Sequence, residues 1–297
     1  MLTARLIIPL LALLAVTAVW GVTFVQVKDA IALYPIFAFL AVRFAIASAT
    51  LALPGGRRLV GLGRRGVAIG AGLGVLLAAG YALQTAGLDR TTVSSTGFIT
   101  GLYVVFTPIL VTLLYGARLG AAVWLGVVLS TAGLALLSGV EAGRLTGDLL
   151  VLGGSAAYSL QIVLLERYAP RYEVLALTLV QMLAAFAGFT LVALALGQLE
   201  TPRGWTVWGA LLVTGVFASA VAYLVQTWAQ QRTTATRTAL VFAMEPVWAA
   251  VFGYWLAGDR LGAVGWAGAA LIMAGIAVSE PAAADALRRL LPRTRPA

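Results

Sequence analysis

The chain has 297 residues, of which 61% are hydrophobic and only 10% are charged. A soluble domain usually carries about 25% charged residues, so this composition excludes a water-soluble enzyme and indicates a membrane protein with little soluble mass. The chain has no Cys, no His and a single Lys without a P-loop sequence around it. Disulfides, thiolate metal sites, Ser-His-Asp catalysis and ATP-driven pumping by this chain are therefore excluded, and neither a metal nor a cofactor is expected.

Ten apolar stretches follow one another along the chain, separated by short polar gaps. Most reach the length of about 20 residues that a helix needs to cross the hydrocarbon of a bilayer. The stretches are 6–27, 33–53, 67–88, 92–114, 120–138, 149–165, 174–196, 205–229, 235–257 and 262–279. They predict an all-α polytopic membrane protein with ten transmembrane helices. The first stretch lacks a clean cleavage site, which favours a retained helix over a signal peptide.

The net charge of +9 is distributed as a topology signal and not as a nucleic-acid surface. Of the 20 basic residues, 14 fall on the side of the N-terminus, 5 on the other side, and Arg43 inside an apolar stretch. By the positive-inside rule both termini are expected in the cytoplasm, with the protein in the inner membrane of a bacterial cell. The basic segment 282–297 is expected to be a cytoplasmic tail near the membrane surface.

An internal repeat divides the chain into two similar halves, residues 1–140 and 147–281. The sequence Tyr81-Ala-Leu-Gln-Thr85 recurs 142 residues later (223 − 81) as Tyr223-Leu-Val-Gln-Thr227. Each half contains five predicted helices, an odd number, so the second half is expected to be inverted in the membrane relative to the first. Inverted repeats are typical of secondary transporters, which bind substrate between the halves and work by alternating access.

Short motifs also recur in a characteristic order. They are Trp20-Gly-Val-Thr-Phe24, Arg43-Phe44, Gly147-Asp-Leu-Leu with Ala157-Tyr158, Glu245-Pro246, and Gly258-Asp-Arg-Leu-Gly262. In this order they resemble the EamA family of the drug/metabolite transporter (DMT) superfamily, over the whole chain. The resemblance implies ten helices in two five-helix repeats, and a central cavity lined by the first, third, fourth, sixth, eighth and ninth of them. It also implies export of small metabolites, amino acids above all, and is nearest to the aromatic amino-acid exporters of the YddG type.

Two charged residues, Glu245 and Arg43, fall near the middle of apolar stretches. A charge at that depth is costly and is normally paired or placed in a wet cavity. Glu245 is expected to bind substrate and, as the only acid in the middle of a stretch, to couple export to protons. The alternative is that Glu245 only satisfies backbone groups that Pro246 leaves open. The resemblance leaves the second helix outside the cavity, so Arg43 is expected to have mainly a structural role.

The Tyr, Gln and Thr of each repeated segment lie at positions i, i+3 and i+4, and therefore share one face of their helix. Such a stripe can line a cavity or hydrogen-bond neighbouring helices together. Because of the inversion, Gln84 and Gln226 would lie near opposite membrane surfaces and act as opposite gates. Tyr103 corresponds to Glu245 at the repeat offset. The residues expected to bind substrate are Trp20, Phe24, Tyr81, Gln84, Thr85, Tyr103, Tyr158, Gln161, Tyr223, Gln226 and Glu245.

The sequence favours a secondary transporter that exports amino acids, with aromatic or neutral side chains preferred, or similar small metabolites. Exchange of sugar nucleotides or phosphate metabolites is an alternative, although such anions need several basic residues in the cavity. A passive channel is a further alternative, and an intramembrane enzyme is disfavoured because the chain has no His or Cys and one deep carboxylate. The coupling ion, with the proton as candidate, and the choice between monomer and homodimer are left open.

Overall fold

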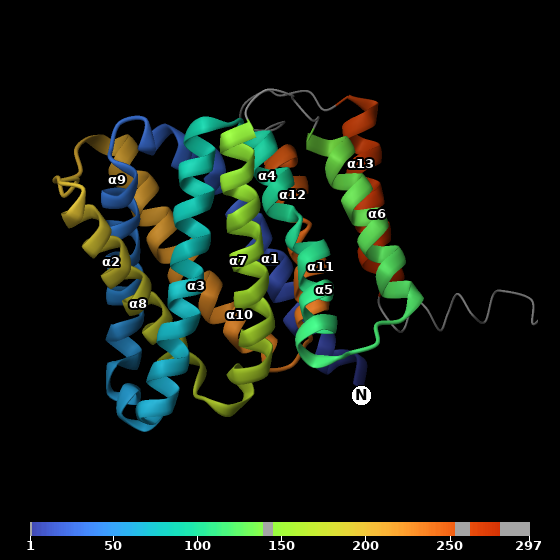
Figure 1. Ribbon diagram of the computed structural model, residues 1–297, viewed down its shortest axis with the longest axis horizontal. Coiled ribbons are helices and arrows are strands. Elements are labelled where there is room, and N and C mark those ends of the chain that lie inside the picture. The colour runs from blue at the N-terminus through green and yellow to red at the C-terminus, as the bar shows by residue number, and fades with distance from the viewer. Residues whose placement is uncertain (1, 139–144, 253–261, 280–297) are drawn as a thin grey trace, which may run out of the picture.

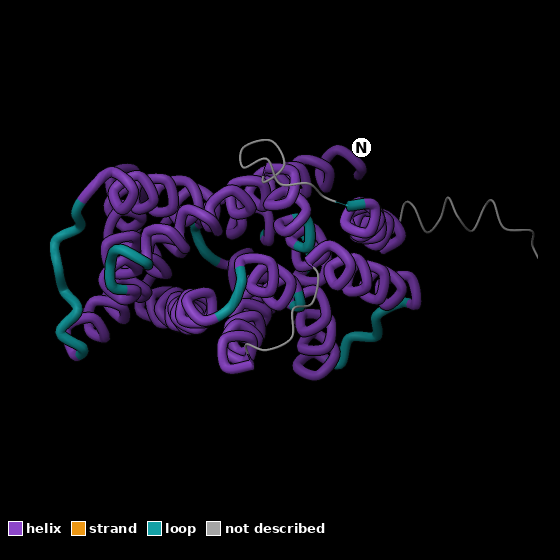
Figure 2. The backbone as a smooth tube through the Cα atoms, turned by 90° about the horizontal axis from the view of Figure 1, so that it is seen from above, coloured by secondary structure: helices purple, strands orange, loops and turns teal. Residues whose placement is uncertain are grey.

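The computed structural model describes residues 2–138, 145–252 and 262–279. Within these ranges the chain forms helices and connecting loops without a strand (Figure 1). The basic tail 282–297 and the motif residues 258–261 lie outside the described residues. The axes of most helices are roughly parallel, so that the view from above looks along many of them (Figure 2).

The helices follow the apolar stretches of the sequence. Six segments are long and apolar enough to cross a membrane, and one of them, Ile36–Leu88, includes both α2 and most of α3. Two shorter apolar helices, Ala121–Leu136 and Ala263–Ser279, add to these. The α-helices are α1 (Leu2–Ile31), α2 (Ile36–Gly55), α3 (Gly63–Arg90), α4 (Val93–Gly101), α5 (Tyr103–Tyr115), α6 (Ala121–Ser138), α7 (Leu145–Tyr168), α8 (Val174–Ala195), α9 (Gly204–Leu212), α10 (Ala222–Gln230), α11 (Ala235–Phe242), α12 (Glu245–Phe252) and α13 (Ala263–Ser279).

Three of the expected helices are interrupted. The stretch 92–114 forms α4 and α5 with a break at Leu102, and the stretch 235–257 breaks between α11 and α12. Pro246 explains the second break, because it has no N–H to donate to the carbonyl of Phe242 four residues earlier. Between α9 and α10, the segment η3 (Val213–Val221) is a π-helix. Such wider turns leave some carbonyls free for other partners and are frequent at functional sites.

Corresponding helices of the two halves pack against each other: α2 against α8, and α6 against α13. At the α6–α13 contact, a Cβ on Gly126 would lie 2.6 Å from the carbonyl oxygen of Gly275, and a Cβ on Gly133 would lie 2.5 Å from that of Gly268. Gly268 and Gly275 are themselves 142 residues beyond Gly126 and Gly133. The contact is therefore reciprocal and antiparallel, as a two-fold axis between the halves requires.

The remaining helices converge between these two pairs. In Figure 1, α3 and α7 lie side by side at the centre, with α2 and α8 on one side and α6 and α13 on the other. Helix α1 contacts α9, α10, α11 and α12. A large apolar cluster built on Phe39, Phe44 and Leu77 fills the α2–α3–α8 side, and a second built on Leu13, Ile162 and Phe242 fills the space around α1, α7 and α11. The candidate site lies where these clusters meet.

Candidate functional site

A cavity lies among the converging helices. All of the residues expected from the sequence to bind substrate line it. The structure adds residues that were not expected there: Thr23, Val27, Arg43, Leu88, Thr100, Ile162 and Phe242. The helices that supply the lining are α1, α2, α3, α4, α5, α7, α10, α11 and α12, so both halves of the chain contribute.

Glu245 begins α12 and is almost fully buried, with 6% of its surface exposed. The hydroxyl of Tyr103 lies 3.2 Å from Glu245 Oε2 and 2.7 Å from the carbonyl oxygen of Phe242. That carbonyl is the one that Pro246 leaves without a helical partner. Tyr103 therefore satisfies the open backbone group, and Glu245 does not, contrary to the alternative considered for it above. The carboxyl group of Glu245 remains directed at the cavity.

Arg43 lies in the cavity wall, which corrects the expectation that the second helix stays outside it. The side chain is 4% exposed. Its Nε donates to the hydroxyl of Ser219 at 2.8 Å, and its Nη2 donates to the hydroxyl of Tyr81 at 3.0 Å. The guanidinium carbon also lies 4.5 Å from the centre of the Tyr81 ring, a cation–π contact. The sequence drew attention to Arg43 because a charged residue is unusual in the middle of an apolar stretch. No pattern in the sequence singled out its partner Ser219.

Aromatic rings form much of the remaining wall. Trp20 packs against Tyr223 at 5.7 Å and against Phe242 at 4.9 Å between ring centres. Tyr81 packs edge-on against Tyr158 at 5.5 Å between ring centres, and its hydroxyl accepts a hydrogen bond from that of Tyr223 at 3.2 Å. The indole N–H of Trp20 donates to the carbonyl of Ala218 in the π-helix η3, at 2.8 Å. The rings are thus held by one another and by polar contacts.

The two glutamines at equivalent repeat positions have different partners. Gln84 donates to Thr100 at 2.9 Å and accepts from the hydroxyl of Tyr158 at 3.1 Å. Gln226 donates to Gln161 at 3.1 Å and to Gln230 at 2.9 Å. Gln226 is completely buried, and its Oε1 has no hydrogen-bond partner among the described residues. Through these hydrogen bonds, Gln84 connects α3 to Tyr158 of α7, and Gln226 connects α10 to Gln161 of α7.

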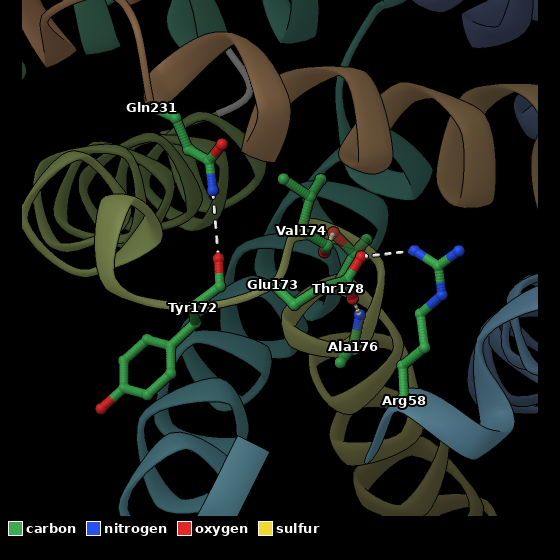
Figure 3. Close-up of polar contacts among 7 residues, drawn as sticks. All are labelled: Arg58, Tyr172, Glu173, Val174, Ala176, Thr178 and Gln231. Atoms are coloured by element: carbon green, nitrogen blue, oxygen red, sulfur yellow. Dashed lines mark hydrogen bonds and ion pairs between the residues drawn. The ribbon is translucent and has the colours of Figure 1, made fainter. Parts of the chain in front are cut away.

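A polar cluster outside the cavity joins the 3-10 helix η1 (Gly56–Leu62), which lies between α2 and α3, to the start of α8 (Figure 3). Arg58 forms an ion pair with Glu173 at 2.8 Å, and Glu173 also accepts from the backbone N–H of Ala176 at 2.7 Å. Partial shielding from water would by itself raise the pKa of Glu173, but these donors outweigh it and hold the pKa below its ordinary value. Nearby, the amide of Gln231 donates to the carbonyl of Tyr172 at 3.1 Å. The cluster fixes three chain segments at one end of the molecule.

In the described ranges, no group of three or more acidic residues is placed so that it could hold a metal ion. The arrangement is instead a deep cavity between two related halves, with one carboxyl group, one guanidinium and a wall of aromatic and amide side chains. A cavity lined from two related halves of a protein with membrane-spanning apolar helices is the arrangement expected of a transporter.

The comparisons with known proteins agree with this class. The chain belongs to the EamA-like transporter family, which matches residues 7–139 and 145–279. It is similar to an uncharacterized transporter of Archaeoglobus fulgidus, with 33% identity over 271 residues, which cover 90% of this chain and 84% of that protein. A crystal structure with 21% sequence identity has the same fold, with a TM-score of 0.78 over 97% of this chain and 99% of the other.

Proposed function

We propose that the chain is a secondary transporter that exports amino acids, with neutral or aromatic side chains preferred, or similar small metabolites, across the inner membrane by alternating access. The observation that carries the proposal is the placement of Glu245, a buried carboxyl group that faces a cavity otherwise walled by aromatic and amide side chains. A carboxylate is the natural partner of a substrate ammonium group, and aromatic faces suit an apolar or planar side chain.

The hydrogen bonds around Glu245 support a role for a proton. The Tyr103 hydroxyl has a single proton, and the nearer acceptor is the Phe242 carbonyl at 2.7 Å. Glu245 Oε2, at 3.2 Å, is the second acceptor within reach of that hydroxyl. A carboxyl group at this place can hold a proton or be ionised. Arrival of an ammonium group would favour the ionised form and release the proton, so substrate and proton would compete for one group.

The experiment is uptake of radiolabelled amino acids by proteoliposomes that contain the purified chain. An imposed pH gradient should drive accumulation of phenylalanine or leucine above the level in empty liposomes, and the uptake should saturate. Glycine should be accumulated less, because it offers no side chain for the aromatic wall. Failure to accumulate any member of an amino-acid panel, with and without a gradient, would refute the proposed substrate class.

A further inference from the structure

Arg43 forms no ion pair with a described residue. The ion pair between Arg58 and Glu173 belongs to the polar cluster outside the cavity. The two hydrogen bonds of Arg43 go to the uncharged hydroxyls of Ser219 and Tyr81 and use two of the five guanidinium N–H donors. The remaining donors have no partner among the described residues, although the side chain is buried in a cavity wall within the membrane.

A purely structural role does not require this charge, as the second half of the chain indicates. Arg43 is seven residues after the first residue of α2, and Gln181 is seven residues after the first residue of α8, the corresponding helix. Gln181 is fully buried and accepts a hydrogen bond from Gln161 at 3.0 Å. A neutral amide therefore meets the packing and hydrogen-bonding needs of this position in one half. The charge in the other half calls for a separate explanation.

The surroundings of Arg43 hold its guanidinium in place for an anion. The Tyr81 ring lies against it at 4.5 Å, and the Ser219 hydroxyl fixes its Nε. A planar guanidinium held in this way matches the two oxygens of a carboxylate, with which it forms paired charge-assisted hydrogen bonds. Glu245, on α12, lines the same cavity as Arg43, on α2. The cavity thus has a cationic group and an acidic group supplied by different helices.

We propose that Arg43 is the residue that binds the carboxylate of the transported molecule and makes a carboxylate a requirement for transport. The inference rests on the proposed function, in which Glu245 takes the ammonium group. Together the two residues select zwitterions over amines and over anions that lack an amino group. Loss of the charge-assisted contact should weaken binding of the carboxylate form by about tenfold or more.

The test compares phenylalanine with phenylalaninamide, which has an uncharged amide in place of the carboxylate. Both compete against uptake of radiolabelled phenylalanine or leucine into proteoliposomes. For the unaltered protein, phenylalaninamide should compete at least about tenfold more weakly. In Arg43→Gln, which places the residue of the second half at this position, phenylalanine should lose affinity until it equals phenylalaninamide. Arg65→Gln, which removes an exposed charge, is the matched control and should leave the ratio unchanged.

Arg43→Lys is a second variant, which keeps the positive charge but loses the planar guanidinium. Its preference for phenylalanine over phenylalaninamide should lie between that of the unaltered protein and that of Arg43→Gln. Equal competition by the two compounds in the unaltered protein would overturn the inference whatever the variants do, and would leave amino-acid transport standing. An unchanged ratio in either variant that still transports would also overturn it. If the proteoliposomes take up labelled inorganic phosphate and no labelled amino acid, the proposed function itself fails, and Arg43 belongs to a phosphate-metabolite exchanger.

Discussion

At the scale of single residues, the contact of Tyr103 with both Phe242 and Glu245 links a helix break to the chemistry of the cavity. Pro246 leaves the carbonyl of Phe242 without its helical N–H donor, and the Tyr103 hydroxyl donates to that carbonyl instead. The carboxyl group of Glu245, next to Pro246, is therefore not used for this purpose. Tyr103 and Glu245 occupy the same position in the two halves, 142 residues apart. The two halves therefore differ at this position: the second half has the acid Glu245, and the first half has Tyr103, which hydrogen-bonds to it.

Glu245→Gln separates the proposed proton coupling from substrate binding, because the amide keeps the size and hydrogen bonds of the acid but does not titrate. We expect this variant to let substrate equilibrate while its accumulation in response to a pH gradient falls to the level without a gradient. Uptake in proteoliposomes with and without the gradient is the measurement. Glu200→Gln, at an exposed position, should behave as the unaltered protein. Gradient-driven accumulation that survives in Glu245→Gln would contradict the coupling role.

Trp20→Ala tests whether the aromatic wall selects the side chain of the substrate. Trp20 contacts Tyr223 and Phe242, and an aromatic contact contributes about 0.5–1.5 kcal/mol beyond buried area, or roughly 2- to 10-fold in affinity. The apparent affinity for phenylalanine should fall by this factor, while that for glycine stays nearly constant. Trp205→Ala removes a largely exposed ring and serves as control. Equal losses of apparent affinity for phenylalanine and glycine would show that Trp20 supports the fold and does not select the side chain of the substrate.

The residues in the cavity show where reasoning from the sequence succeeds. The repeat and the i, i+3, i+4 spacing placed Tyr81, Gln84 and Thr85 on one face, and that face lines the cavity. Arg43 was expected to be structural because the family resemblance leaves the second helix outside the cavity, and the apolar sequence of α2 offers no pattern that would have corrected this. The Ser219 contact depends on the π-helix η3, whose changed phase is not encoded in any periodic pattern.

At the scale of elements, the start of α8 is fixed by Glu173 in two ways: as N-cap to Ala176 and as partner of Arg58. Glu173→Ala should lower the apparent melting temperature of the detergent-solubilised protein more than Arg58→Ala does. Loss of an N-cap costs about 0.5–2 kcal/mol, whereas an exposed ion pair contributes only about 0–1 kcal/mol. Equal effects of the two substitutions would contradict this account of the helix start.

The same interaction predicts a pH dependence. Because the pKa of Glu173 is lowered in the folded protein, its ionised form stabilises the fold at pH values above the ordinary value of 4.5. The contribution is lost as the pH falls through the lower, folded-state pKa. The difference in melting temperature between the unaltered protein and Glu173→Ala should therefore be constant near neutral pH and shrink in acid.

Gln84 and Gln226 join α7 to different helices, which suits opposite gates. In the Cys-free chain, single Cys substitutions at these positions can be labelled without background. If the gates alternate, substrate should increase the labelling rate at one position and decrease it at the other. The unsubstituted chain is the blank, and Gly61→Cys, at an exposed position in the polar gap after α2, should label at a rate that substrate does not alter. Parallel changes at Gln84 and Gln226 would leave both as packing contacts.

The helix breaks mark the limit of prediction at this scale. The apolar stretches gave the positions of the helices to within a few residues in most cases, since composition alone decides what is buried in lipid. The break before Glu245 follows from Pro246, whereas the break at Leu102 and the π-helix Val213–Val221 have no proline at the break and depend on tertiary contacts such as that of Trp20 with the Ala218 carbonyl. Those contacts join residues far apart in sequence and leave no local pattern.

At the scale of the whole molecule, the reciprocal contact of α6 with α13 and the packing of α2 on α8 relate the two halves of the bundle. The cavity draws its lining from both halves. A carrier with this arrangement exposes its site to one side at a time as the halves change their relative packing, whereas a channel stays open to both. The central claim is thus that substrate crosses by alternating access and not by diffusion through a continuous pore.

Counterflow tests that claim most directly. Proteoliposomes are loaded with unlabelled phenylalanine at high concentration and diluted into a trace of labelled phenylalanine, with no ion gradient. A carrier that exchanges substrate through one site should accumulate the label transiently above its external concentration, and the accumulation should saturate with internal phenylalanine. A monotonic approach of the label to the external concentration, unaffected by the internal load, would contradict alternating access and indicate a channel.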